Sequence, residues 1–131
     1  MGDFKMNKLL TLTILLTTLA NCSSGIEEYN CIRKGDGAEI KLSFNLVDNL
    51  FTETQDNYIG DGFIKEKNTI HLVLHGYDQK KKEAYPYAFF NMKTKKYYFL
   101  PFAFDKQQNV PPLTDLPLYD KDDEFLIANC K

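Results

Sequence analysis

The sequence predicts an all-β fold, in which a small antiparallel sheet forms the whole domain. From Ile40 to Leu46, apolar and polar residues alternate with the period of two expected of a strand with one wet face. Nine aromatic residues lie between Tyr85 and Phe104, and aromatic side chains favour a pleated surface. No window of useful length has the apolar period of a helix. These three observations together indicate a sheet.

The expected strands cover residues 38–47, 58–65, 68–77, 84–92, 96–104 and 124–130. Residues 48–56 are expected to form a turn or a short helix. The sequence Gly60-Asp61-Gly62 suggests a bulge or a turn inside the second of these strands. Pro86 and Pro101 cannot donate a hydrogen bond to a ladder, so their strands should lie at an edge or contain a break.

Residues 105–123 have no regular pattern, and they include three prolines. Loops of this length are usually functional or disordered. Apolar residues on a proline-stiffened segment lose little entropy when they dock into a partner. The residues assigned to partner binding on this basis are Val110, Pro111, Pro112, Leu113, Leu116, Leu118 and Tyr119. The alternative is that these side chains cover one open end of the sheet.

The two histidines of the chain, His71 and His75, lie four residues apart in an expected strand. At about 3.3 Å per residue, a strand separates them by roughly 13 Å, too far to share one metal ion. We therefore expect both to face solvent, with no metal site and no cofactor. The motifs GxSxG and HExxH, the P-loop and the Gly-rich dinucleotide turn are absent from the sequence, so no catalytic residue is assigned and a binding module is expected.

The N-terminal residues resemble an export signal. Lys5 and Lys8 precede a run of twelve residues, Leu9 to Ala20, that carries no charge. Twelve residues at about 1.5 Å each give roughly 18 Å of helix, which is short of the roughly 30 Å hydrocarbon core. A cleaved signal is therefore favoured over a membrane-spanning anchor. Translation that begins at Met6 would leave the same export signal.

The sequence Leu19-Ala20-Asn21-Cys22 resembles the lipobox of bacterial lipoproteins, in which the cysteine becomes the lipidated first residue. Asn21 departs from the small residue usual before that cysteine. The resemblance implies a signal peptide at 1–21, a lipidated tether at 22–27 and one β domain at 28–131, anchored in the outer membrane and facing the periplasm. The alternative is ordinary cleavage after Ala20, which would leave Cys22 as a thiol.

The chain contains three cysteines, and an odd number in an exported protein leaves one unpaired. If Cys22 carries the lipid, Cys31 and Cys130 remain as one pair. A bridge between them would close a loop of about 100 residues and stabilise the fold by roughly 4–5 kcal/mol on the chain-entropy model.

Composition excludes several classes of protein. The 131 residues are 44% hydrophobic and 26% charged, which is typical of one globular domain. Residues 1–21 include Lys5, Lys8 and Asp3, so their removal leaves 14 basic and 17 acidic side chains, a net charge of −3. Such a domain has no basic field for nucleic acid, whereas it suits a basic protein partner.

The domain is framed by Glu28-Tyr29-Asn30-Cys31, followed by a strand at Ile40-Lys41-Leu42, and by the residues from Phe125 to Cys130, which together make up about a quarter of it. These segments are similar to the ends of the membrane-bound lysozyme inhibitors of C-type lysozyme. The resemblance implies an eight-stranded barrel or strongly curled sheet in which a Cys31–Cys130 disulfide joins the ends. The family's Ser-Gly-x-x-Tyr and Trp-x-Lys-Gly motifs are absent, so no inhibitory residue is carried over.

We therefore expect a non-enzymatic periplasmic lipoprotein that binds and inhibits a protein partner, such as a lysozyme, another cell-wall hydrolase or a toxin. Two alternatives remain. In the first, Tyr85, Tyr87, Tyr97 and Phe99 line the barrel interior and hold an apolar ligand. In the second, the protein faces outward from the cell and contacts a host.

Overall fold

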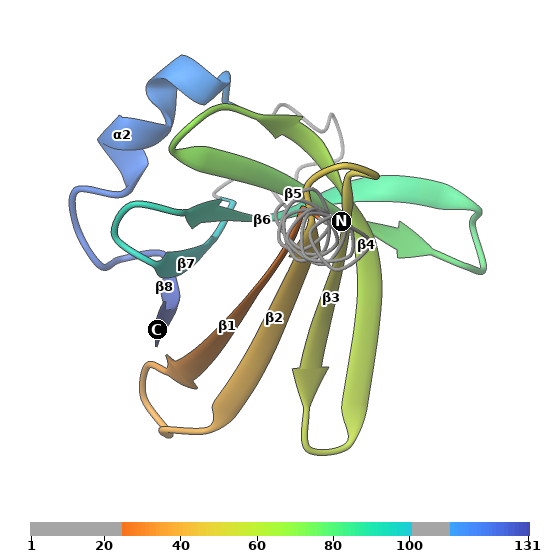
Figure 1. Ribbon diagram of the computed structural model, residues 1–131, viewed down its shortest axis with the longest axis horizontal. Coiled ribbons are helices and arrows are strands. Elements are labelled where there is room, and N and C mark those ends of the chain that lie inside the picture. Colours follow the sequence, from red (N-terminus) through yellow and green to blue (C-terminus); the bar gives the residue numbers. More distant parts are fainter. Residues whose placement is uncertain (1–24, 101–110) are drawn as a thin grey trace, which may run out of the picture.

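The computed structural model describes residues 25–100 and 111–131, and these form a closed antiparallel barrel of eight strands (Figure 1). Successive strands are neighbours around the barrel, and the last strand pairs with the first. The elements are β1 (Ile26–Arg33), β2 (Glu39–Asn45), β3 (Leu50–Gln55), β4 (Tyr58–Lys67), β5 (His71–Asp78), β6 (Glu83–Asn91), β7 (Lys96–Phe99), η1 (Leu113–Asp115), α2 (Leu116–Tyr119) and β8 (Leu126–Cys130). The all-β antiparallel prediction is confirmed.

The barrel closes where Cys31 and Cys130 lie opposite each other on β1 and β8. Their Cα atoms are 3.9 Å apart and the two side chains form a disulfide, which confirms the predicted pair. β1 begins at Ile26, so the last two residues assigned to the tether are part of the first strand. The signal segment and Cys22 lie outside the described residues.

The barrel interior is filled by apolar and aromatic side chains. Ile40, Leu42 and Phe44 of β2 are buried, as their alternation predicted. The ring of Phe44 lies 5.0 Å from that of Phe90 and 5.9 Å from that of Tyr29, centroid to centroid. The other buried members of this interior cluster are Cys31, Phe51, Ile64, Leu72, Leu74, Ala88, Tyr97, Ile127 and Ala128.

The prediction of a turn or short helix at 48–56 holds only at its ends, where 48–49 and 56 lie in turns, and it is wrong in between, because Leu50–Gln55 form β3. Phe51 and Glu53 are both buried, while Thr52 and Thr54, which alternate with them, are partly exposed. The strand does alternate, but one of its inward positions holds a carboxylate. A polar residue at a core position hides the period of two, since the pattern is read from hydrophobicity.

The bulge or turn expected at Gly60-Asp61-Gly62 is also absent. These residues pair one to one with β3, and the irregularity of β4 lies further along, between Ile64 and Glu66. Pro86 does coincide with a break, because the β5–β6 register shifts beside it, between Leu74 and His75. Pairing of β6 with β7 begins only at Ala88, so the missing N–H of Pro86 interrupts no ladder on that side.

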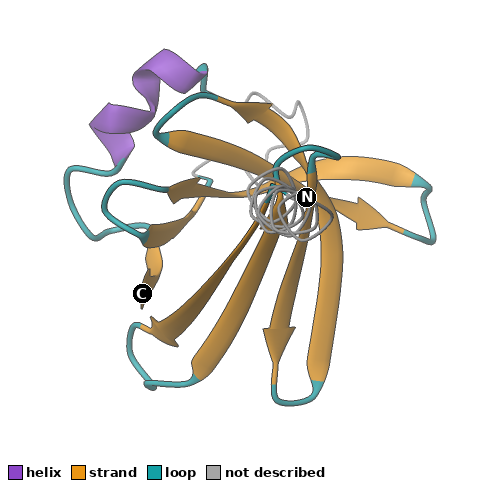
Figure 2. Cartoon of the chain, viewed as in Figure 1, coloured by secondary structure: helices purple, strands orange, loops and turns teal. Residues whose placement is uncertain are grey.

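A second apolar cluster lies outside the barrel, where η1 and α2 cover β5, β6 and β7 (Figure 2). Leu116 of α2 is fully buried there against Val73, Phe89 and Tyr98. Part of the segment that was expected to be irregular is thus helical, and it covers an outer face rather than an open end. In the described part of the chain, no helix is long and apolar enough to cross a membrane.

The expectation that His71 and His75 face solvent is wrong, because both are buried. The Nε2 atom of His71 lies 2.7 Å from the Asp120 carboxylate, which also accepts a 2.8 Å hydrogen bond from the Asn91 amide. His75 packs against the ring of Phe63. Burial lowers the pKa of His75, and the charge of Lys65 lowers it further.

The packing of α2 predicts different effects for its two leucines. Leu116→Ala should lower the free energy of unfolding by about 2–5 kcal/mol, because it leaves a cavity in a closed cluster. Leu118 is 64% exposed, so Leu118→Ala should change stability by no more than about 0.5 kcal/mol. Urea unfolding of the two variants measures both values, and equal effects would contradict this packing.

Candidate functional site

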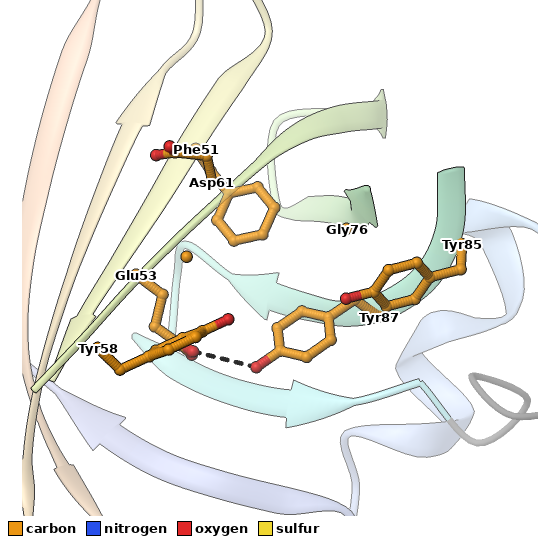
Figure 3. A pocket seen from close by; sticks show the side chains of 8 residues that line it. Phe51, Glu53, Tyr58, Asp61, Gly76, Tyr85 and Tyr87 are labelled. Atoms are coloured by element: carbon orange, nitrogen blue, oxygen red, sulfur yellow. Dashed lines mark hydrogen bonds between the residues drawn. The ribbon is translucent and has the colours of Figure 1, made fainter. Parts of the chain in front are cut away.

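A pocket opens at the end of the barrel where the β3–β4 and β5–β6 hairpins turn (Figure 3). β4 and β5 pair from Lys67–Leu72 to Gly62–Gly76, and beyond that point the strands separate. We call the resulting opening the aromatic pocket. Its lining residues are Phe51, Glu53, Tyr58, Gly60, Asp61, Gly76, Tyr85 and Tyr87. The rings of Tyr58, Tyr85 and Tyr87 point toward one another from opposite sides of it.

Glu53 provides the buried charged group of the aromatic pocket, whereas the Asp61 carboxylate in the same lining is exposed. Its side chain is only 3% exposed, and its carboxylate accepts a 3.1 Å hydrogen bond from the Tyr87 hydroxyl. Burial raises the pKa of Tyr87, and the negative charge of Glu53 raises it further, so Tyr87 remains a donor at neutral pH. The hydroxyl of Tyr97 is buried in the same region, where burial raises its pKa and the negative charge of Glu53 raises it further.

No basic side chain in residues 25–100 or 111–131 forms an ion pair with Glu53. Arg33, which lines a neighbouring hollow together with Glu53, binds Asp36 at 3.3 Å and donates to the side-chain oxygen of Gln55. Buried charges in proteins are usually paired, because removing an ion from water is costly. Among the described residues, Glu53 is therefore a buried negative charge without an ion-pair partner, and it lines the aromatic pocket.

Glycines make room for the rings that line the pocket. A Cβ atom at Gly60 would overlap the ring of Tyr58, and one at Gly76 would overlap the ring of Tyr85. A Cβ atom at Gly62 would overlap the ring of Phe51 and the backbone oxygen of His75. The Gly-x-Gly sequence therefore gives close ring packing on the inner face of β4, not a bulge.

These overlaps predict a contrast between two alanine substitutions on β4. Gly62→Ala should destabilise the barrel by about 1–3 kcal/mol, because the backbone oxygen of His75 cannot move away. Gly60→Ala should cost less than about 1 kcal/mol, because the half-exposed ring of Tyr58 can turn outward. Chemical unfolding of both variants tests the contrast, and it fails if Gly60→Ala is the more damaging of the two.

The cavity within the aromatic pocket has a volume of about 20 Å³. A site of roughly 10–15 Å³ holds one water molecule, so this cavity accepts a group of about that size. A second hollow of about 250 Å³ also reaches Glu53 and Tyr87, and Arg33 and Lys34 line part of it. The two hollows differ in character, because only the larger one has basic side chains in its lining.

The four aromatic residues expected to line a cavity in the barrel interior lie in three different surroundings. Tyr85 and Tyr87 line the aromatic pocket, while Tyr97 is fully buried in the interior cluster. Phe99 is 44% exposed and lines the larger hollow together with Tyr87.

The residues assigned to partner binding on the 105–123 segment are placed in different surroundings. Leu116 and Pro111 are buried, Leu113 and Tyr119 are partly buried, and Pro112 and Leu118 are exposed. Val110 lies outside the described residues. The Tyr98 hydroxyl donates to the backbone oxygen of Asp120 at 3.3 Å, which fastens the end of α2 to the barrel. Of the apolar side chains described here, Leu118 is therefore the one best placed to meet a partner.

Sequence reasoning missed Glu53, Tyr58 and the glycines that shape the pocket. The available signal was the alternation of Phe51, Glu53 and Gln55 with threonines, which places a carboxylate on the inner face. No family model, no curated protein and no solved structure matches the chain.

Proposed function

We propose that this protein is a non-enzymatic lipoprotein of the bacterial outer membrane that faces the periplasm and binds and inhibits another protein. In this proposal Cys22 carries the lipid, and the barrel is the recognition domain. The partner is a basic protein that attacks the cell wall, either a lysozyme, another hydrolase or a delivered toxin. The resemblance of the chain ends to lysozyme inhibitors and the acidic charge of the domain support this choice.

The observation that supports recognition most strongly is the aromatic pocket. The barrel interior is packed with side chains, whereas the hairpin end has a concave surface where tyrosines surround a buried carboxylate. Tyrosines are enriched at protein interfaces, because they combine large apolar area with a polar tip. A partner that docks at the hairpin end would cover these rings and reach Glu53.

The exposed part of α2 offers a second contact. Leu118 is 64% exposed, and Pro117 beside it is also exposed. Leu116 and the Tyr98–Asp120 hydrogen bond hold this short helix against the barrel, so its exposed side would lose little entropy on binding.

Inhibition of enzymes tests this function directly. The lipidated protein, purified in detergent, should slow cell-wall hydrolysis by a C-type lysozyme or by a toxin delivered to the periplasm. Tyr58→Ala combined with Leu118→Asp should weaken that inhibition, because both positions are exposed and neither holds the fold together. No binding and no inhibition across a panel of such enzymes would contradict the proposal.

The larger hollow favours a second candidate function, an envelope lipoprotein that holds an apolar ligand. Its volume of about 250 Å³ is close to the lower limit of small-molecule sites, which is roughly 300 Å³. Native mass spectrometry of the purified protein would detect a retained ligand. Protease treatment of intact cells separates a periplasm-facing lipoprotein from one that is exposed at the surface to a host.

A further inference from the structure

We infer that the aromatic pocket binds the ammonium group of a lysine side chain that the partner presents. This inference rests on the proposed function and names the chemistry of its contact. The pocket brings together a buried carboxylate without a cation, several tyrosine rings and a cavity the size of one small polar group.

The charge of the ligand follows from Glu53. This carboxylate is 97% buried, and the groups that interact with it in the described structure are the neutral hydroxyls of Tyr87 and Tyr97. A donated hydrogen bond satisfies one of its several lone pairs and leaves the charge uncompensated. A cation that enters beside Glu53 would form a charge-assisted hydrogen bond in a region of low dielectric, where such a bond is strong.

The aromatic lining favours the same kind of ligand. The faces of tyrosine and phenylalanine rings attract cations that approach within about 6 Å of the ring centre. The rings of Phe51 and Tyr87 are stacked at 6.3 Å, and Tyr85 meets Tyr87 edge-on at 6.4 Å. Tyr58 and Tyr85 are 55% and 38% exposed, so they flank the entrance and can pack against the alkyl chain behind the charged group.

The size of the cavity selects an ammonium group. A volume of about 20 Å³ accepts a group as large as a water molecule, and a primary ammonium is of that size. A guanidinium is a wider planar fork, and a trimethylammonium group is bulkier still. Lysine is charged at neutral pH because its pKa is about 10.4, so a lysine of the partner arrives as a cation.

The larger hollow is a poorer site for a cation, although it also reaches Glu53. Arg33 and Lys34 line this hollow, and their positive charges disfavour the entry of a further cation. Lysine entry is therefore expected between the β3–β4 and β5–β6 hairpins, where Figure 3 shows the tyrosine rings facing one another.

The test is a titration of the intact, purified protein with butylammonium, which reproduces the lysine side chain. Chemical shifts of the tyrosine rings should saturate with a Kd on the order of 1 mM, as expected for a ligand of this size. Three matched probes separate the causes of binding. Butanol keeps the alkyl chain but lacks the charge, butylguanidinium changes the shape of the charged group, and butyltrimethylammonium enlarges that group. All three probes should bind at least about tenfold more weakly than butylammonium.

Two variants connect the titration to the pocket. Glu53→Gln keeps the side-chain size but removes the charge, and it should weaken butylammonium binding at least tenfold. Glu66→Gln is its control, since Glu66 is an exposed residue of β4 outside the pocket. Tyr58→Ala should weaken binding about two- to fivefold, as expected for one exposed cation–π contact, and Tyr77→Ala is its control at a similarly exposed tyrosine. Because Tyr58 is half-exposed, this variant stays informative if Glu53→Gln impairs folding.

Equal binding of butanol, or preference for either larger cation, would overturn the inference. So would butylammonium binding that folded Glu53→Gln and Tyr58→Ala leave unchanged. Failure of the proposed function is a different result, because there the protein binds butylammonium as expected but neither binds nor inhibits any enzyme of the panel. Conversely, inhibition that persists in folded Glu53→Gln would leave the function standing and reject the lysine site.

Discussion

Replacing Cys31 and Cys130 together by alanine is expected to lower the free energy of unfolding by about 4–5 kcal/mol. The two cysteines are 99 positions apart, so the disulfide closes a loop of nearly the whole domain and restricts the unfolded chain strongly. The midpoint of thermal unfolding should fall by roughly 20 °C, since about 1 kcal/mol corresponds to several degrees in a domain of this size. Calorimetry and urea unfolding of the variant measure both effects.

Reduction of the unaltered protein provides the control for the lost sulfur atoms. Cys31 is buried in the interior cluster, so alanine at this position also removes packing contacts. Treatment with a thiol reductant breaks the bond and keeps both side chains. A loss below about 1 kcal/mol under both conditions would mean that strand pairing alone determines the stability of the barrel.

The second large effect is expected at Cys22. Cys22→Ser should move the protein from the membrane fraction to the soluble fraction, because serine cannot accept the thioether lipid. Several acyl chains anchor a protein stably, while a chain without them has no comparable membrane affinity. Cell fractionation measures the distribution, and intact-mass analysis of the unaltered protein should detect the added lipid.

Two outcomes would contradict the lipid anchor. In one, the unaltered protein is soluble, begins at Asn21 and has the mass expected for a free thiol at Cys22, as ordinary cleavage after Ala20 would give. In the other, Cys22→Ser remains with the membrane to the same extent as the unaltered chain. Activity against the enzyme panel is independent of both results, because the barrel begins at Ile26.

The sequence was most informative where one strand face is apolar. The alternation around Phe44 predicted β2 correctly, because every inward position of that strand is hydrophobic. β3 has the same geometry, but Glu53 takes the place of an apolar residue on its inner face, and the strand was interpreted as a turn or a short helix. The candidate site and the error in the fold prediction thus have the same cause, a carboxylate at a core position.

Contacts between distant segments were the other information that the sequence did not provide. The period of two places His71 and His75 on the face of β5 opposite to its inward leucines, but it does not reveal which segment covers that outer face. His71 is covered by Asp120, which lies 49 residues further along the chain and contacts its ring nitrogen. Pro86 was easier to interpret, since a missing N–H restricts the ladder locally and the register shift lies beside it.

The pocket could not be predicted from residue types alone. Gly60 and Gly62 were interpreted as the sign of a bulge or a turn, whereas in the barrel they provide space for the rings of Tyr58 and Phe51. Tyr85 and Tyr87 were expected to line an interior cavity, and they instead line an opening between two hairpins. The separation of β4 and β5 that creates this opening depends on register, which the hydrophobic pattern specifies only weakly in a strand with two glycines and many exposed residues such as β4.

The central claim is that a protein partner binds at the hairpin end of the barrel, and site-specific photocrosslinking in living cells tests it most directly. A photoreactive residue is placed at Tyr58, which flanks the aromatic pocket, or at Tyr77, which is similarly exposed and does not line it. Position 58 should form an adduct with a peptide that contains lysine, the adduct should disappear in Glu53→Gln, and position 77 should form none. An adduct from position 77 alone, or one from position 58 that Glu53→Gln does not reduce, would contradict the claim.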